Sequence, residues 1–241
     1  MSYLILDIET VPDASLWTAA PPKPRARTKT DDFAPLYAHR PIAIGSVLLS
    51  DQHMVEYIGV AGTTLFGDDE AALLTAWSAW MQQARPVLVS YNGRGFDISV
   101  IELRALRHGV NLGWHDKDYR NRYGESHIDL FDQVTKFGII ARNGFSLGTM
   151  STLIGLPPKG GMDGSKVAGM FAAGEAAKIE AYCASDCART AFLFMRYQLM
   201  RGRMTVNEYR EAAGALLRLC TEREMHGVLF GADQKRLLLE G

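Results

Sequence analysis

The sequence predicts an α/β protein with one mixed sheet of five strands, flanked by helices and followed by a C-terminal helical extension. Short apolar runs rich in Val, Ile and Leu alternate with longer segments in which apolar residues recur every three or four positions. The first pattern indicates buried strands and the second amphipathic helices, and their alternation is typical of the α/β class. Of the 241 residues, 47% are hydrophobic and 22% are charged, which supplies enough apolar material for a core.

The strands are predicted where an apolar or β-branched run stops at residues that favour turns. Ser50, Asp51 and Gln52 connect the second and third runs, so these two strands are expected to form a hairpin. The fourth run ends at the turn-rich tetrapeptide Asn92–Gly95. The predicted strands are Leu4–Thr10, Pro41–Leu49, Met54–Val60, Pro86–Tyr91 and His127–Leu130.

The helices are predicted from the helical spacing of apolar residues. Gly109 ends the second helix, because glycine adopts the left-handed conformation that often follows a helix. Thr205 and Glu208 have the spacing of a capping box, which starts the last helix. The polar segment 113–126 is predicted as a loop, and 157–161 as a break. The predicted helices are Asp68–Gln83, Phe96–Arg107, Phe131–Phe137, Ser146–Ile154, Ala176–Met200 and Thr205–Arg223.

The balance of charge gives no overall attraction to polyanions or to membranes. The chain has 26 basic and 27 acidic residues and a formal net charge of −1, so a nucleic-acid-binding protein of this composition must concentrate its basic residues locally. One concentration lies in the Pro-rich segment 21–30, with Lys23, Arg25, Arg27 and Lys29. This segment is either a solvated surface loop or a basic arm that closes over a phosphate backbone.

The cellular location and the redox state of the cysteines are expected from the same composition. No apolar run is long enough to span a membrane and no leader-type segment is recognisable, so a cytoplasmic location is expected. Cys183, Cys187 and Cys220 are an odd number without zinc-type pairs, and we expect reduced thiols that pack in the core.

Two acidic residues lie in the first predicted strand. Successive side chains of a strand point to opposite faces, so Asp7 and Glu9 share one face. Two carboxylates side by side on a core strand cost several kcal/mol per ion unless a charge compensates them, and a divalent cation with oxygen ligands is the usual compensation. The alternative is that Glu9 lies in water at the strand end and Asp7 caps a turn.

Three further polar residues stand at places where helices begin or are buried. Asp97 lies in the first turn of a predicted helix, where a carboxylate is favoured whether or not it has a function. Asn92, in the preceding turn, is equally common there for structural reasons. Tyr182 and Asp186 lie four residues apart and so on one face of the long predicted helix. A Tyr/Asp pair of this kind is either structural or part of a site.

The order of these motifs resembles the DEDD superfamily of 3′–5′ exonucleases, in its tyrosine-bearing (DEDDy) subgroup. The motifs are Asp7-Ile8-Glu9-Thr10, then Asn92-Gly93-Arg94-Gly95-Phe96-Asp97, and finally Tyr182-Cys183-Ala184-Ser185-Asp186. The second motif is similar to its form in the proofreading domains of family B DNA polymerases. With the segment 127–130, the pattern is similar to stand-alone predicted exonucleases related to those domains. The resemblance covers about residues 4–197 and implies a ribonuclease H-like domain over 1–200, with 201–241 as an extension.

The resemblance also implies the roles of the acidic residues. Asp7, Glu9, Asp97 and Asp186 would bind two divalent cations, Mg²⁺ or Mn²⁺, and Tyr182 would orient the attacking water. An oxygen-only site suits these ions and offers no soft ligand for zinc. With an unperturbed pKa of about 10, a phenol is a hydrogen-bond donor at neutral pH and a poor base.

Five side chains are candidates for contact with the substrate: Asn92, Arg94, Phe96, Lys159 and Lys166. Phe96 either stacks on a terminal base or packs in the core. The basic three either contact phosphates or are solvated loop charges. Asp129 and His127 are expected to be structural or to support the site.

The implied function is that of a metal-dependent 3′–5′ exonuclease acting on the single-stranded 3′ end of nucleic acid. DNA is expected in preference to RNA, in repair or proofreading. The alternatives are a catalytically silent nucleic-acid-binding module on the same fold and a related metal nuclease with endonuclease or small-substrate activity. The presence of all four carboxylates favours an enzyme over the silent module.

Overall fold

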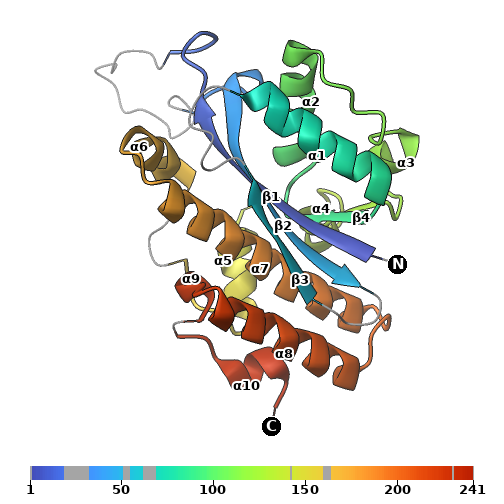
Figure 1. Ribbon diagram of the computed structural model, residues 1–241. Helices are drawn as coiled ribbons and strands as arrows, with labels where there is room; N and C mark the ends of the chain where they lie inside the picture. Colours follow the sequence, from blue (N-terminus) through green and yellow to red (C-terminus); the bar gives the residue numbers. More distant parts are fainter. Residues whose placement is uncertain are drawn as a thin grey trace.

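The computed structural model describes residues 2–18, 33–50, 55–61, 69–141, 143–159, 164–229 and 231–240. Its centre is the predicted mixed sheet, whose five strands run in the order β3-β2-β1-β4-β5 (Figure 1). β1 pairs antiparallel with β2 and parallel with β4, so the central strand joins the two halves of the sheet. The strands are β1 (Ser2–Pro12), β2 (His39–Ser50), β3 (Val55–Ala61), β4 (Val87–Ser90) and β5 (His127–Asp129).

Helices cover both faces of the sheet. The long helix α7 has the predicted bounds, and α8 begins at the predicted capping box, in which the Glu208 amide donates to Thr205 Oγ1 and the Thr205 amide donates to the Glu208 carboxylate. The helices are α1 (Glu70–Ala84), α2 (Asp97–His108), α3 (Lys117–Arg120), α4 (Leu130–Val134), α5 (Leu147–Leu153), α6 (Val167–Ala172), α7 (Ala176–Met200), α8 (Val206–Glu222), α9 (His226–Leu229) and α10 (Gln234–Leu238), with the short 3-10 turns η2 (Leu36–Ala38) and η3 (Gly164–Lys166).

The alternation of side chains along β1 assigns the two faces. Leu4, Leu6 and Ile8 pack in one hydrophobic cluster with residues of α1 and α2. Ile5 and, further along, Val11 point to the opposite face and pack in clusters that include residues of α7. Figure 1 shows the same arrangement, with α1 and α2 on one side of the sheet and α7, backed by α8, on the other. Asp7 and Glu9 therefore face α7.

Several short elements differ from the sequence prediction. The predicted loop 113–126 contains the single-turn helix α3, and α6, α9 and α10 were not predicted, because a helix of one or two turns has too few apolar repeats to show its period. α4 ends at Val134, three residues before the predicted end, since Lys136 and Phe137 adopt positive φ angles of 51° and 57°. The predicted turn residues 51–52 and the basic residues of 21–30 lie outside the described residues.

The C-terminal helices share a core with the rest of the domain. Tyr209 and Leu216 of α8 and Leu237 of α10 are fully buried in the cluster that contains Ile5 of β1 and Phe192 of α7. Residues 201–241 therefore continue the layer that α7 begins, and their description as an extension remains our proposal. In the part of the chain that the structure describes, every helix is too short or too polar to cross a bilayer.

Candidate active site

The two acidic residues of β1 lie where the neighbouring strand carries small residues. Asp7 is opposite Gly45 of β2 and Glu9 is opposite Ala43, so no large side chain of β2 covers the carboxylates from the paired positions. The register shifts between Glu9 and Thr10, which marks a β-bulge at this place. Bulges re-aim side chains and are frequent next to active sites.

On its other edge, β1 is paired over only part of its length. β4 pairs with Tyr3 to Ile5 and then turns away, which leaves the edge of β1 beside Asp7 without a strand partner. The turn after β4 fills this place. Oδ1 of Asp97 accepts a hydrogen bond of 3.1 Å from the amide of Ile8, an amide on the part of β1 that β4 does not reach. The third acidic residue is therefore fixed by the backbone of the strand that bears the first two.

The turn that carries Asp97 depends on its glycine and asparagine. Asn92 has a φ of +64°, a conformation that Asn tolerates better than most residues. A Cβ atom on Gly93 would lie 2.4 Å from the hydroxyl of Ser90, so only glycine fits there. The carboxylate of Asp129 accepts hydrogen bonds from the amides of Asn92 (2.8 Å) and Arg94 (2.9 Å). Asp129 thus holds the turn, which is the supporting role expected for it.

The fourth acidic residue comes from the middle of α7. Asp186 is only 5% exposed, as are Glu9 at 5% and Asp97 at 6%, while Asp7 is half-buried. Tyr182 lies one helical turn before Asp186 and is half-buried. The structure thus brings all four predicted carboxylates, and the predicted tyrosine, to one place between β1, α2 and α7.

A thiol also belongs to this cluster, which corrects the expectation of an oxygen-only site. Sγ of Cys183 lies 3.7 Å from Oδ2 of Asp7. Asp7, Glu9 and Cys183 each offer one ligand atom, and the three atoms lie within 4.8 Å of one another. Cys183 precedes Asp186 by three residues and so shares its helix face, a spacing that the sequence already contains. The site therefore does offer a soft ligand.

The negative charge of the cluster is largely uncompensated. Burial, together with the charges of Asp186, Glu9 and Asp97, raises the pKa of Asp7 well above its usual value. Burial and Asp186 likewise raise the pKa of Glu9, which Lys159 opposes. Burial raises the pKa of Asp97 to about 7, although backbone hydrogen bonds lower it. Acidic residues in this condition favour a bound cation, and carboxylate oxygens are ligands that hard divalent cations take, so the residues present fit such an ion.

One basic side chain from the described residues reaches the cluster. Nζ of Lys159 lies 2.5 Å from Oδ2 of Asp186 and 5.4 Å from the centre of the Tyr182 ring. The loop that carries Lys159 is anchored by the buried Arg189, which donates 2.7 Å to the carbonyl of Pro157. A cavity of about 210 Å³ adjoins this ion pair and is also lined by Lys178 and Arg189. The sequence had suggested a phosphate contact for Lys159 but not its pairing with Asp186.

The remaining candidates for substrate contact lie in different surroundings. The guanidinium of Arg94 donates to four backbone carbonyls of the 119–127 region, and this favours a structural role over a phosphate contact. Phe96 is half-buried against the α1/α2 cluster and touches two other rings. Lys166 is exposed at the end of η3, ahead of α6. His127 is buried and hydrogen-bonded to Ser90 at 2.8 Å, as a packing role requires.

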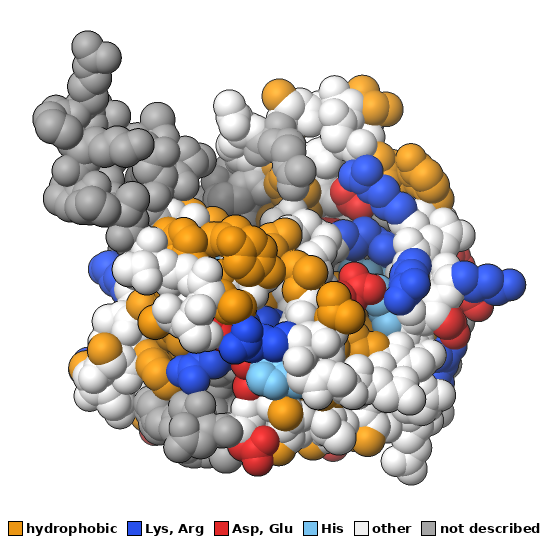
Figure 2. Space-filling model, turned by 90° about the horizontal axis from the view of Figure 1, so that it is seen from above, with side chains coloured by type: hydrophobic (Ala, Val, Ile, Leu, Met, Phe, Trp, Pro, Cys, Tyr) orange, Lys and Arg blue, Asp and Glu red, His pale blue; other side chains and the backbone are white. Residues whose placement is uncertain are grey.

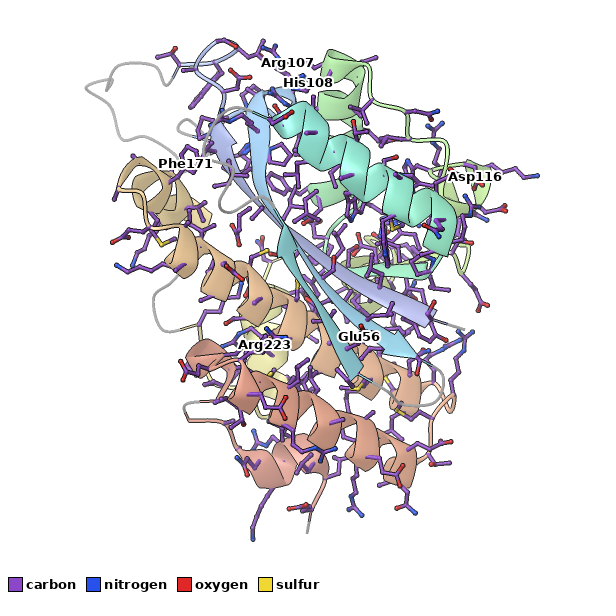
Figure 3. All side chains as sticks on the ribbon, viewed as in Figure 1. Glu56, Arg107, His108, Asp116, Phe171 and Arg223 are labelled. Atoms are coloured by element: carbon purple, nitrogen blue, oxygen red, sulfur yellow. The ribbon has the colours of Figure 1, made fainter. Side chains whose placement is uncertain are left out.

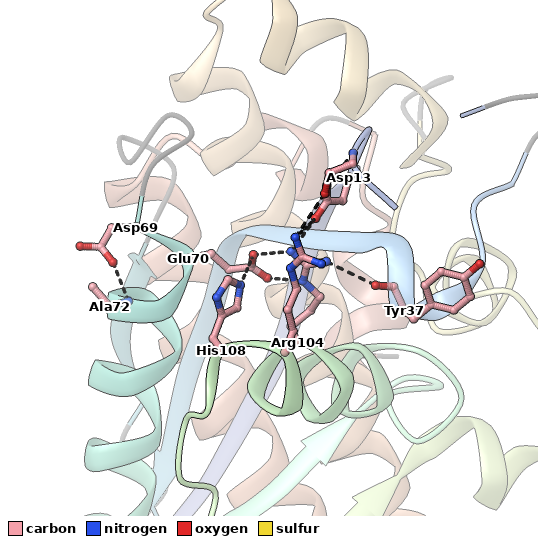
Figure 4. A network of polar contacts seen from close by, with 9 residues as sticks. Asp13, Tyr37, Asp69, Glu70, Ala72, Arg104 and His108 are labelled. Carbon is pink, nitrogen blue, oxygen red and sulfur yellow. Dashed lines mark hydrogen bonds and ion pairs between the residues drawn. The ribbon is translucent and has the colours of Figure 1, made fainter. Parts of the chain in front are cut away.

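A second charged cluster, which the sequence did not reveal, lies at the end of β1 on the α2 side (Figure 4). Arg104 donates to both oxygens of Glu70 at 2.6 Å and to Asp13 at 2.9 Å, and His108 is 2.8 Å from Glu70. The cluster borders a cavity of about 520 Å³. Figure 3 labels Arg107 and His108 at the end of α2 and Phe171 on α6, and Figure 2 shows basic, acidic and histidine side chains gathered on the upper face.

The fold and the site define a class of protein: an α/β domain whose central strand and two flanking helices bring four carboxylates together. Residues 31–231 match a family described as predicted 3′–5′ exonucleases related to the exonuclease domain of PolB. The chain belongs to this family, which confirms the resemblance seen in the motifs.

Two proteins to which the chain is similar are DNA polymerases. It is 30% identical over 142 residues to the catalytic polypeptide of DNA polymerase epsilon from Schizosaccharomyces pombe, a match that covers 54% of this chain and 6% of the polymerase. Its fold is similar to the family B DNA polymerase of the archaeon Pyrobaculum calidifontis, with a TM-score of 0.54 at 15% identity, over 99% of this chain and 28% of that one. The chain therefore spans only a small part of each polymerase, and the second match confirms the fold class.

Proposed function

We propose that this chain is a metal-dependent 3′–5′ exonuclease that removes nucleotides from single-stranded 3′ ends. The observation that carries the proposal is the convergence of Asp7, Glu9, Asp97 and Asp186 with their negative charge largely uncompensated. Family membership supports the same activity. A silent binding module would have no need to maintain such a costly arrangement of buried acidic residues.

The four carboxylates would hold divalent cations, Mg²⁺ or Mn²⁺, in the proposed site. Bound there, two such ions would supply an activated water and neutralise charge on the phosphate and on the leaving oxygen. Asp7 faces the open edge of β1 and is the candidate that both ions share. Asp97 is held by the Ile8 amide, so its carboxylate keeps a fixed direction while the substrate enters.

Tyr182 would act as a hydrogen-bond donor. Burial, and the charges of Asp186, Glu9 and Asp7, raise the pKa of its phenol. The hydroxyl therefore keeps its proton at neutral pH and can orient a water molecule or a phosphate oxygen, but it does not serve as a base.

Lys159 would move between two partners. In the structure its ammonium group pairs with Asp186, in the neighbourhood that a divalent cation would occupy. When cations neutralise Asp186, the ammonium group becomes available to a phosphate of the substrate. Lys166, Asn92 and Phe96 remain candidates for substrate contact, and Arg94 is the weakest of the five because of its carbonyl partners.

DNA is the proposed substrate in preference to RNA, and repair or proofreading the proposed setting. Both similar proteins are named as DNA polymerases, which supports a DNA end. The two-ion mechanism by itself does not distinguish the sugars.

Degradation of a 5′-labelled single strand tests the proposal. We expect a ladder of products shortened from the 3′ end with Mg²⁺ or Mn²⁺, none with EDTA, and slower shortening of RNA of the same sequence. A strand with a blocked 3′ end should persist. Intact substrate under every metal condition would contradict the enzyme, and binding that ignores metal would then support the silent module. Cleavage of a circular single strand would instead indicate an endonuclease.

A further inference from the structure

Three aromatic rings form a cluster next to the carboxylates. Phe33 packs on His39 with 4.7 Å between ring centres and lies 6.0 Å from Phe96, and His39 meets Phe96 edge-on at 5.0 Å. Phe96 is the residue before Asp97, and His39 is bonded to Thr10, the residue after Glu9. The cluster is therefore linked, within one residue, to two of the chain segments that carry acidic residues.

The histidine of this cluster has a defined tautomer. Its Nε2 atom lies 2.9 Å from the carbonyl oxygen of Ala34, which can only accept, so Nε2 carries the proton. Burial lowers the pKa of His39, which keeps the ring neutral, so Nδ1 accepts a hydrogen bond of 2.9 Å from the hydroxyl of Thr10. The ring thus fixes the segment that carries Phe33 to the end of β1.

The Arg104 cluster fixes the same segment from the other side. Arg104 donates to the carbonyl of Tyr37 at 3.3 Å, as Figure 4 shows, and the amide of Asp13 donates to the carbonyl of Ala38 at 2.7 Å. Because Arg104 is itself held by two carboxylates, residues 33–39 rest on a rigid base. Phe33 is nevertheless 59% exposed, so a large apolar ring is held in place with one side open to solvent.

We propose that Phe33, supported by His39 and Phe96, is a platform on which a base of the single-stranded substrate stacks as its 3′ end enters the site. The inference rests on the proposed exonuclease function and adds a substrate contact at a residue outside the three acidic motifs. Stacking on an aromatic ring accepts every base, as removal of successive nucleotides requires. A ring that is already ordered loses little conformational freedom when the base binds.

Binding of an oligonucleotide with 2-aminopurine near its 3′ end tests the platform, because stacking quenches the fluorescence of this base. The measurement uses the full chain in an Asp186→Asn background, so that the probe is not degraded. Phe33→Ala should weaken binding about tenfold and abolish part of the quenching. Phe33→Trp should retain both, and Phe33→Leu, which keeps the apolar volume but not the aromatic face, should behave like Phe33→Ala.

Two controls separate stacking from a general loss of structure. Tyr123→Ala removes another exposed aromatic ring, one that packs on Phe137 at 4.8 Å, and should leave binding unchanged. An oligonucleotide with abasic residues near its 3′ end should bind the parent protein and Phe33→Ala about equally, since neither complex then contains the stacked base.

The outcomes distinguish the two proposals. If the chain degrades 3′ ends but Phe33→Ala binds and quenches like the parent protein, the platform is wrong and the exonuclease function stands. If Phe33→Ala weakens binding to normal and abasic strands alike, the ring is not a stacking surface. If the wild-type chain neither binds nor degrades single strands, the proposed function fails and the platform fails with it.

Discussion

Two clusters of charged side chains lie near β1, and they treat buried acidic residues in opposite ways. In the cluster on the α2 side, Asp13 and Glu70 surround Arg104, so protein cations neutralise the acidic residues. In the cluster on the α7 side, four carboxylates meet, and among the described residues the ion pair at their position is that of Lys159 with Asp186. The pKa directions follow: hydrogen bonds from Ser15 and Arg104 outweigh burial and lower the pKa of Asp13 to about 2.

The difference shows which cluster is structural and which is functional. A compensated cluster stabilises the fold and gains nothing from a ligand, whereas an uncompensated one stores a free-energy cost that a bound cation relieves. The following four predictions test this distinction, beginning with the largest expected effect.

Removal of one carboxylate from the uncompensated cluster should abolish activity without loss of stability. For Asp7→Asn we expect 3′-end degradation to fall by more than about a hundredfold, because a ligand of the proposed ions is lost. In EDTA the unfolding midpoint should stay equal or rise, since a like-charge repulsion is removed. Kinetics and urea denaturation measure the two effects. Asp116→Asn, at an exposed ion pair with Arg85, is the control and should keep full activity. A sharp loss of stability would contradict this account.

Removal of the cation from the compensated cluster should have the opposite result. Arg104 is 2% exposed at its side chain, and Arg104→Ala leaves two buried carboxylates without their partner. We expect a loss of about 3–5 kcal/mol in the free energy of unfolding. Arg107→Ala removes a side chain that is 38% exposed and 3.7 Å from Asp13, and should cost less than about 1 kcal/mol. Equal losses in urea denaturation would show that Arg104 has no special role.

The stability contributed by Asp13 should be lost in acid. Its pKa of about 2 in the folded chain lies below the ordinary 3.8, so the unfolded chain binds the proton more tightly. The contribution is therefore complete above about pH 5 and disappears as the pH falls from about 4 towards 2, with a total of about 2 kcal/mol. Denaturation of the wild type and of Asp13→Asn across this range measures it. A difference that does not change with pH would be contrary to the expected ionisation.

The smallest effect concerns the thiol in the acidic cluster. Cys183→Ser should weaken the binding of Cd²⁺, a soft ion, by about tenfold and leave Mg²⁺ binding nearly unchanged, because sulfur is a poor ligand for hard ions. The near-ultraviolet absorption of a sulfur–cadmium bond reports the first, and competition with Mn²⁺ reports the second. Cys220→Ser, at a buried thiol in the cluster shared by α7 and α8, serves as the control. Unchanged Cd²⁺ absorption in Cys183→Ser would exclude the thiol as a ligand.

The sequence predicted those features that depend on local period and order. The bounds of α7 follow from its regular apolar spacing, and the three motifs of Asp7, Asp97 and Asp186 identified the family before the fold was known. Face sharing on a strand also placed Asp7 and Glu9 toward the same helix. These predictions needed only neighbours within about four residues.

Features that depend on approach from distant segments could not be predicted. Lys159 reaches Asp186 from a loop, and Arg104 finds its partners at the end of β1 and the start of α1, with no sequence period to relate them. Phe33 lies in an irregular segment, where an aromatic residue gives no sign of its exposure. Cys183 is the exception, since its spacing of three from Asp186 already places it on the same face and would have indicated a mixed oxygen and sulfur site.

Direct titration of the chain with Mn²⁺, followed by the paramagnetic resonance of the free ion, tests the central claim that the acidic cluster on the α7 side is a cation site. We expect the wild type to bind two ions per chain and Asp7→Asn to lose at least one of them, while Asp13→Asn, in the compensated cluster, binds like the wild type. Mn²⁺ binding that is absent in the wild type, or that is the same in Asp7→Asn as in the wild type, would contradict the account.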